Sequence, residues 1–277
     1  MYGRVHADIT LRGRAAEGRA PAPYALARSV RVGEVDMTTR EPSRALARPV
    51  KLSVLIPVYN EAPYIEEVLR TIETVKLPEG VTTEIICVDD GSVDGTLEIL
   101  ARFGDRIRIH RSVLNSGKGT AIRIALSFAT GSIVLIQDAD LEYDPNDYGA
   151  LILPIIAGEA DVVYGSRFLG KIENMRFVNL LANRLLTLTV RVLYGQRITD
   201  EATCYKAFRA DVVKGLTLRC RRFEFCPEVT AKLCKKGHRI LEVPIGYRGR
   251  TTNEGKKIRW TDRVAAFWTL LRYRFTD

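Results

Sequence analysis

The sequence is poor in cysteine and has no long apolar run, and both shortages exclude classes of protein. Its five cysteines are odd in number and show no Cys-x-x-Cys spacing, which argues against a zinc site or a disulfide framework. No stretch reaches the roughly 20 apolar residues that cross a bilayer, and the N-terminal region has no apolar core of a secretory signal. We therefore expect a reduced, cytoplasmic protein, either soluble or peripheral on the inner membrane face.

The N-terminal region differs in composition from the rest of the chain. Residues 1–50 contain nine arginines and no lysine, with many alanines and prolines and no helical or strand period. Such a segment cannot bury enough apolar surface to fold, so we expect residues 1–48 to be a disordered leader. Translation could instead begin at Met37. Binding of nucleic acid by the leader is an alternative, but no nucleic-acid-binding signature follows it and we expect no such partner.

The whole chain carries a net charge of +9, and its basic residues cluster in the second half. The clusters are Arg219–Arg222, Lys232–Arg239 and Arg248–Arg274. Clustered positive charge favours an anionic partner, either phosphates or a lipid surface. The alternative for each cluster is a solvated helix face.

Short apolar runs alternate with helical periods from residue 51 onward. The expected strands are Lys51–Pro57, Glu84–Val88, Ile107–Ser112, Ile133–Ile136 and Asp161–Tyr164, then Arg239–Val243 continued by Ile245–Tyr247 across Pro244. The expected helices are Glu61–Thr74, Gly95–Phe103, Gly119–Ala129, Leu151–Ile156, Phe177–Tyr194, Phe223–Lys236 and Trp260–Phe275. This alternation predicts an α/β fold, a Rossmann-like and mostly parallel sheet flanked by helices on both faces.

Three carboxylates follow the apolar strand expected at Ile133–Ile136. Asp138, Asp140 and Glu142 share one side of an extended backbone because side chains alternate along it. They repel one another unless a cation lies between them, and their hard oxygens favour Mg²⁺ or Mn²⁺ bridged to phosphate. The alternative is an exposed turn before Pro145 that caps the next helix.

Polar motifs also follow the strands expected at Lys51–Pro57 and Glu84–Val88, and a glycine turn precedes the helix expected at Gly119–Ala129. With the acidic motif these make four, and together they resemble a known family. They read Pro57-Val-Tyr-Asn-Glu-Ala, Val88-Asp-Asp-Gly-Ser-Val-Asp-Gly-Thr, Asn115-Ser-Gly-Lys-Gly-Thr-Ala and Asp138-Ala-Asp. Their order resembles the GT-A glycosyltransferases of family 2, within them the dolichol-phosphate mannose or glucose synthases, which are polyprenyl-phosphate glycosyltransferases. The resemblance implies a single GT-A domain over residues 49–262, followed by a basic-aromatic helix over residues 263–277.

The resemblance implies a nucleotide-sugar site at the strand ends. The residues matching the base and ribose contacts are Pro57, Tyr59, Glu61, Asp89 and Asp90. Lys118, in a glycine-flanked turn, would contact the donor or its diphosphate, or is a surface lysine. The residues matching the divalent-ion site are Asp138, Asp140 and Glu142, and bound Mg²⁺ or Mn²⁺ would act as a Lewis acid on the leaving group. Arg250 and Lys256, with Lys257, would lie on a loop that closes over the diphosphate.

The resemblance also implies an acceptor site. Arg167, within Gly165-Ser-Arg-Phe, would clamp an anionic acceptor. Arg176 and Asn179 lie where relatives place further phosphate contacts. Asp200 or Glu201 would be the general base if the acceptor is a hydroxyl; otherwise Asp200 orients the neighbouring loop and helix.

Together these features predict an inverting single displacement. A hexose would pass from GDP-mannose or UDP-glucose to a polyprenyl or dolichyl phosphate, which is already ionised and needs no base. The C-terminal helix would contact a membrane surface through its aromatic and basic residues, or it packs on the sheet. Many relatives in the family carry membrane helices after this region, whereas this sequence ends there. This difference favours an alternative in which the acceptor is soluble, such as a nucleoside or a secondary metabolite. The non-enzyme alternative is a nucleotide-sugar binding protein.

Overall fold

The computed structural model describes residues 45–47, 49–250 and 260–276. The described residues all belong to one compact unit, and Met1–Arg40 lies outside them. The expected leader therefore lies almost wholly outside them, as does Met37. The amide of Leu46 donates to the carbonyl of Ile156 at 3.1 Å, so the folded unit begins before the expected boundary at residue 48.

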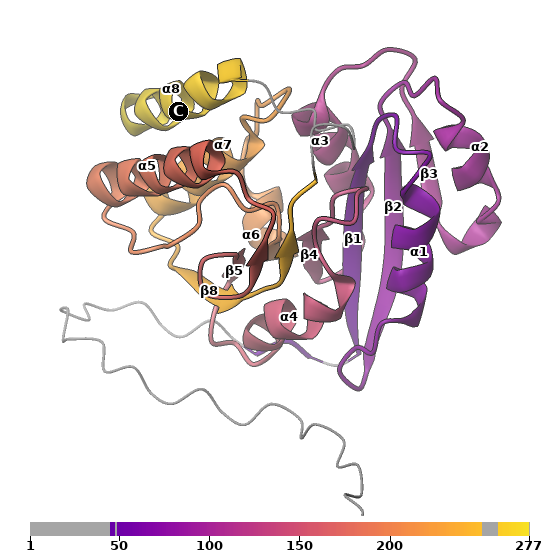
Figure 1. Ribbon diagram of the computed structural model, residues 1–277. Helices are drawn as coiled ribbons and strands as arrows, with labels where there is room; N and C mark the ends of the chain where they lie inside the picture. The colour runs from indigo at the N-terminus through magenta and orange to yellow at the C-terminus, as the bar shows by residue number, and fades with distance from the viewer. Residues whose placement is uncertain (1–44, 48, 251–259, 277) are drawn as a thin grey trace, which may run out of the picture. The chain divides into compact units, whose positions relative to one another are not determined.

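A seven-stranded sheet in the order β3-β2-β1-β4-β7-β5-β8 forms the centre of this unit (Figure 1). Its strands are β1 (Val50–Val58), β2 (Val81–Asp89), β3 (Arg108–Arg111), β4 (Ile133–Ile136), β5 (Val162–Ser166), β7 (Lys206–Arg209) and β8 (Ile240–Pro244). Neighbouring strands run parallel except β7, which is antiparallel to both β4 and β5. The predicted α/β fold with a mostly parallel sheet is confirmed.

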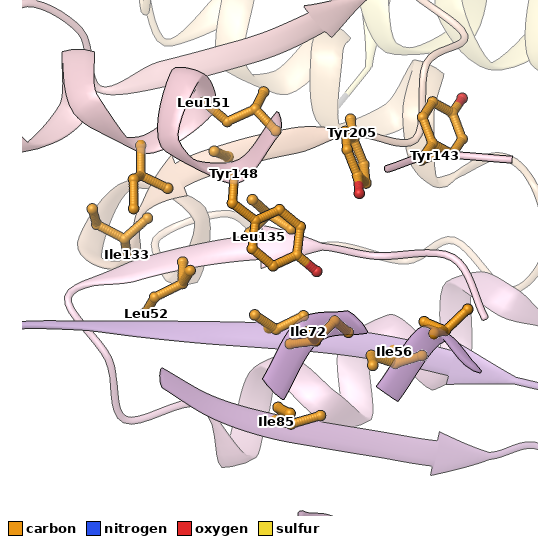
Figure 2. Packing of buried hydrophobic residues seen from close by; sticks show 14 of the residues in the cluster. Leu52, Ile56, Ile72, Ile85, Ile133, Leu135, Tyr143, Tyr148, Leu151 and Tyr205 are labelled. Carbon is orange, nitrogen blue, oxygen red and sulfur yellow. The ribbon is translucent and has the colours of Figure 1, made fainter. Parts of the chain in front are cut away.

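Helices cover both faces of the sheet because strand side chains alternate between two apolar clusters. On one face lie α1 (Ile65–Thr74), α2 (Thr96–Ala101) and α4 (Tyr148–Ile156), packed on the cluster seen in Figure 2. On the other lie α3 (Lys118–Phe128), α5 (Phe177–Tyr194), α6 (Ala210–Lys214), α7 (Phe225–Lys235) and α8 (Trp260–Phe275). In β1, for example, Val54 and Ile56 face the first cluster and Leu55 the second.

Most predicted elements are present within a few residues of their expected bounds, but β7 and α6 were not predicted and the strand expected around Pro244 differs. The strand β7 was not predicted, because Lys206-Ala-Phe-Arg209 contains no apolar run. The strand expected to continue past Pro244 ends there. Tyr247–Arg248 (β9) pairs instead with Ile172–Glu173 (β6) in a separate two-stranded sheet. The remaining short elements are the 3₁₀ turns η1 (Gly104–Arg106) and η2 (Pro145–Asp147).

The C-terminal helix is part of the same unit. It spans Trp260–Phe275, the bounds expected from the sequence, and it lies beside α5 and α7 (Figure 1). Ala266, Leu270 and Tyr273 are buried in the second apolar cluster. Its other face is exposed. The helix therefore packs on the fold, as one expectation held, and its position also leaves a face for the membrane contact that the other expectation held. Within the described residues, no helix is long and apolar enough to span a bilayer.

Glu84 ties together the leading ends of three strands. Its carboxylate accepts hydrogen bonds from Ser53 on β1 and from the Thr130 and Gly131 amides before β4, and it pairs with Lys51 at 2.8 Å. Burial opposes ionisation, but these donors outweigh it and lower the pKa of Glu84 to about 2. The network fixes where β4 begins and hence where the carboxylates after it lie.

Gly131 has no room for a side chain at this junction. A Cβ atom there would lie 2.4 Å from the Lys51 carbonyl oxygen, so we expect Gly131→Ala to destabilise the fold by about 1–3 kcal/mol. The control is Gly149→Ala in α4, where no atom lies within 4 Å of the added carbon and the change should stabilise by about 0.5–1 kcal/mol. Urea unfolding measures both. Equal effects would contradict this account of the junction.

Candidate active site

A cavity of about 750 Å³ lies at the carboxyl ends of β1, β2 and β4. Most residues predicted to form the site line it, namely Pro57, Tyr59, Glu61, Asp90, Lys118, Asp138, Asp140, Glu142, Arg167, Asn179, Glu201 and Arg250. Asp89, Arg176 and Asp200 do not line it. Lys256 and Lys257 lie outside the described residues.

The segment after β4 is held by a buried amide. The side-chain oxygen of Gln137 accepts hydrogen bonds from the hydroxyls of Tyr148 at 2.8 Å and Tyr205 at 2.6 Å. Its amide nitrogen donates to the backbone carbonyl of Asp138 at 2.9 Å. Tyr143 stacks on Tyr205 with ring centroids 4.7 Å apart, and both are labelled in Figure 2. These contacts leave the Asp138 side chain directed at the cavity.

Asp138 is paired with Lys118. The Lys118 ammonium reaches from the first turn of α3 and contacts the Asp138 carboxylate in an ion pair that is largely buried. Burial opposes ionisation of Asp138, but the adjacent ammonium outweighs it and holds the pKa of the carboxyl below its usual range. Lys118 therefore faces the cavity rather than solvent, and the surface-lysine alternative is wrong.

Arg250 neutralises the other carboxylates. Its guanidinium lies 2.7 Å from Asp140 and 3.0 Å from Glu61, and its amide donates to Glu142 at 2.8 Å. Burial raises the pKa of Asp140 to about 7, helped by the negative charges of Asp138 and Glu142 and opposed by Arg250. Acidic groups this close together either take up a proton or pair with a cation.

The carboxylates fit a phosphate-bound cation better than a closed metal cage. Across residues 45–47, 49–250 and 260–276, no three acidic, histidine or cysteine side chains gather closely enough to hold a metal ion. Asp138 faces Lys118, whereas Asp140 and Glu142 face Arg250, so the expected convergence of the three is not present. Magnesium usually takes only one or two carboxylates and completes its shell with water and phosphate oxygens. Asp138 and Asp140 suit that arrangement.

The turn after β2 is held partly by its own acids. Asp90 accepts hydrogen bonds from the amides of Ser116 at 2.9 Å and Gly117 at 2.7 Å, which joins it to the loop before α3. Asp89 accepts from the Ser92 amide at 3.2 Å, and its other oxygen is buried without a partner among the described residues. Asp90 therefore shapes the cavity wall, and Asp89 supports the turn from behind it.

The N-terminus of α3 is not open to a phosphate. The amides of Gly119 and Thr120 donate to the carbonyls of Arg222 and Arg221 at 2.9 and 3.0 Å. A Cβ atom at Gly117 would lie 2.5 Å from the Arg221 carbonyl, so glycine permits this close approach. The positive charge that α3 offers to the cavity is thus the Lys118 ammonium.

Arg167 and Asp200 form a buried bidentate pair. The Arg167 Nε and Nη2 atoms each lie 2.7 Å from an oxygen of Asp200, and Tyr247 lies against the guanidinium. Asp200 is fully buried and acts by fixing Arg167. Because a guanidinium has five N–H donors, the pair leaves donors of Arg167 for the cavity that it lines.

The side of the cavity next to α5 and α8 contains a contact that the sequence did not reveal. The Arg263 guanidinium of α8 hydrogen-bonds the Asn179 side chain of α5, and both residues line the cavity. The sequence indicated Arg263 only as part of an amphipathic helix. Arg176 is exposed at the start of α5 and outside the cavity wall. Arg222 also lines the cavity, and only the basic cluster at Arg219–Arg222 pointed to it.

Glu201 is a carboxylate on the same side of the cavity. It lines the cavity, and its Oε2 atom is buried without a partner among the described residues. Burial raises the pKa of Glu201 to about 8. Lys206, itself fully buried, donates to the Glu201 backbone carbonyl at 2.7 Å. Of the two residues considered as a base, only Glu201 therefore reaches the cavity.

Two named glycosyltransferases are similar to this chain in sequence. A dolichol-phosphate mannosyltransferase of Pyrococcus furiosus is 30% identical over 213 residues, 75% of this chain and 59% of that protein. An undecaprenyl-phosphate 4-deoxy-4-formamido-L-arabinose transferase of Salmonella paratyphi B is 28% identical over 76% of this chain and 64% of its own length. The matched region thus spans less than two thirds of each of these relatives.

A solved structure shares the fold. Glucosyl-3-phosphoglycerate synthase of Mycobacterium tuberculosis, crystallised with Mn²⁺, uridine diphosphate and glucosyl-3-phosphoglycerate, superimposes with a TM-score of 0.64. Its identity is 21%, and the superposition covers 81% of this chain and 78% of that one. The same enzyme has been crystallised with Mg²⁺ and uridine diphosphate. At this identity the likeness supports the fold alone, and it confirms the predicted GT-A fold.

The family follows from a match over the sheet and its motifs. Residues 53–217, which are more than half of the chain, match the family described as glycosyl transferase family 2. The match includes most of β1, all of β2 to β5 and β7, and the acidic residues Asp138, Asp140 and Glu142, and it confirms the resemblance seen in the motifs. The chain belongs to glycosyl transferase family 2.

Proposed function

We propose that this glycosyltransferase moves a sugar from a nucleotide donor to a polyprenyl phosphate. The observation that carries the proposal is that one cavity joins two unlike walls. One wall is acidic and lies at the strand ends, with Asp138 and Asp140. The other is formed by α5, α8 and Arg167, and the same two helices expose apolar side chains. Relatives whose names specify dolichol phosphate and undecaprenyl phosphate support the lipid acceptor.

The acidic wall suits the donor. Tyr59, Glu61 and Asp90 line the part of the cavity beyond β1 and β2, where carboxylates can accept hydrogen bonds from a base and a ribose. Asp138 and Asp140 would hold Mg²⁺ or Mn²⁺, which would neutralise charge on the departing nucleoside diphosphate. Lys118 and Arg250 supply further positive charge beside them.

The basic wall suits an acceptor phosphate. Arg167 is held rigid by Asp200, and Arg263 lies against Asn179 on the same side of the cavity. A phosphate bound there is already ionised, so its oxygen can attack the anomeric carbon directly and invert the configuration in one displacement. The residues of this wall would position the nucleophile rather than take a proton from it.

The outer surfaces of α5 and α8 favour a lipid membrane as the place of reaction. On α5 the exposed apolar residues are Phe177, Val178, Leu181, Leu185, Leu188 and Val192, and on α8 they are Trp260, Val264, Trp268, Leu271 and Phe275. Both sets repeat at helical spacing, and Arg184, Arg191, Arg272 and Arg274 are exposed among them. Apolar stripes with arginines suit an anionic bilayer surface. We place the enzyme as a peripheral protein on the cytoplasmic face.

The first test is a transfer assay with purified protein, Mg²⁺ or Mn²⁺, several nucleotide sugars and a short polyprenyl phosphate. Mass spectrometry should detect a glycosylated lipid phosphate from one donor. Asp140→Ala should lower the rate at least about a hundredfold, because charge on the leaving group loses its support. Glu159→Ala, which removes an exposed carboxylate outside the cavity, is the control. Donor hydrolysis without lipid product would overturn the lipid acceptor, and nucleotide-sugar binding without turnover would indicate a binding protein.

A second test addresses the membrane surface. Trp268→Glu and Leu188→Glu should each reduce cosedimentation with anionic vesicles at least about tenfold, because each puts a charge into an apolar stripe. Val113→Glu, at a side chain that is 91% exposed elsewhere, should leave binding unchanged. Transfer to a short, water-soluble acceptor should persist in all three variants. Equal vesicle binding by all of them would exclude the stripes as the contact.

A soluble hydroxyl acceptor is the second candidate function, and Glu201 is the observation that favours it. A hydroxyl must lose its proton to attack, and Glu201, whose pKa burial raises to about 8, is a stronger base than an ordinary carboxylate once it is ionised, so this transfer would speed up as the pH rises through about 8. In that case Glu201→Gln would abolish transfer to hydroxyl acceptors, whereas it would leave transfer to a phosphate acceptor largely intact.

Glu201 should also affect stability in a pH-dependent way. Its pKa in the folded protein, about 8, is raised from 4.5 by burial, so protonation favours the folded state. This contribution is complete below the unfolded pKa and is lost as the pH rises through about 8, by at most about 5 kcal/mol. Urea unfolding from about pH 5 to about pH 9 should therefore show a smaller loss for Glu201→Gln than for wild type. Glu98→Gln, at an exposed position, is the control, and parallel curves for wild type and Glu201→Gln would contradict the assignment.

A further inference from the structure

Two cysteine thiols meet in the wall of the cavity. Cys204 lies just before β7 and Cys226 lies in the first turn of α7, and both line the cavity. Each side chain lies close enough to the other to affect its ionisation. Cys226 also donates to the carbonyl of Thr203 at 3.5 Å, which holds it against the Cys204 segment.

The pair adjoins the charged part of the cavity. The Cys204 sulfur lies 3.1 Å from the Lys118 ammonium, which in turn pairs with Asp138. The Cys204 amide donates to the Tyr143 hydroxyl at 3.2 Å. Cys226 lies at a helix N-terminus, an environment that favours the reactive thiolate. The thiols are thus accessible from the cavity and next to the groups assigned to the donor diphosphate.

The other three cysteines lack these features. Cys87 is fully buried in β2, and Cys220 is 5% exposed. Cys234 is partly exposed on α7, but it lies outside the cavity wall. All five are free thiols in this structure. Cys204 and Cys226 are therefore the two thiols that an oxidant in the cavity can reach together, and we expect oxidation to occur at this pair.

We propose that Cys204 and Cys226 form a redox modification site, a dithiol that a peroxide converts to an intramolecular disulfide. One thiolate attacks a peroxide oxygen and becomes a sulfenic acid, with release of water. The second thiol then displaces the hydroxyl group as another water, and the sulfur–sulfur bond forms. Each cysteine gives up one proton and one electron, and the two protons and two electrons together reduce one peroxide molecule to two waters. A dithiol reductant reverses the change by thiol–disulfide exchange.

The disulfide would alter the donor side of the cavity. Bonding to Cys226 draws the Cys204 sulfur away from Lys118, and the lysine then loses one of the two partners that fix its ammonium beside Asp138. We expect the oxidised protein to bind nucleoside diphosphate at least about tenfold more weakly. This consequence rests on the proposed function, whereas formation of the disulfide does not.

Non-reducing peptide mapping tests the site directly. Full-length protein is reduced, treated with hydrogen peroxide, alkylated, digested and analysed by mass spectrometry. The expected result is a cross-linked peptide pair containing Cys204 and Cys226, absent after dithiothreitol. Cys204→Ser and Cys226→Ser should abolish this product, and Cys234→Ser should retain it. Alkylation of both thiols after peroxide, or pairing with another cysteine, would overturn the proposal.

Calorimetric titration with uridine and guanosine diphosphate in the presence of Mg²⁺ tests the consequence. Weaker binding after oxidation, restored by dithiothreitol and absent in Cys226→Ser, is expected. Equal affinity of the oxidised and reduced forms would overturn the effect on the donor side. If neither form binds nucleotide while the disulfide forms, the proposed function fails and the modification site stands.

Discussion

The arrangement of the site depends on neutralising buried negative charge. Glu61, Asp138, Asp140 and Glu142 all line one end of the cavity, and such a group would not remain together in a low-dielectric setting without cations. Lys118 and Arg250 provide them in this structure. Because one comes from α3 and the other from the segment after β9, the carboxylates also hold distant parts of the chain together. A donor that brings its own cation would meet these two side chains as competitors or as additional contacts.

The scaffold controls where that charge lies. Parallel pairing of β1 with β2 and β4 brings three strand ends to one edge of the sheet, and Gln137 fixes the backbone just beyond β4. The side proposed for the acceptor depends on tertiary packing instead. Its arginines come from the end of β5 and from α8, and each is oriented by a residue from another element. The strand-end side is thus set by the sheet itself, whereas the opposite side is assembled from separate elements.

The sequence predicted the first half of the fold and the acidic wall better than the rest. Apolar runs and glycine turns mark β1 to β4, and the motif acids follow these strands directly, so their meeting point follows from parallel pairing. The strand β7 could not be predicted, because its Lys206 is buried by an interaction with the ring of Tyr164, 3.5 Å away. The pairing of Arg263 with Asn179 depends on how α8 packs beside α5, and no local pattern encodes that contact.

The position of β7 has a consequence for how the protein forms. It is antiparallel to its neighbours and separates β4 from β5, although β4 ends at Ile136 and β7 begins at Lys206. Until β7 has been made, no strand joins β4 to β5, and β8, which pairs with β5, follows β7 in the chain. During synthesis β1 to β4 can therefore pair with one another before the rest of the sheet exists. Until β7 is added, the outer edge of β4 is exposed to pairing with other chains.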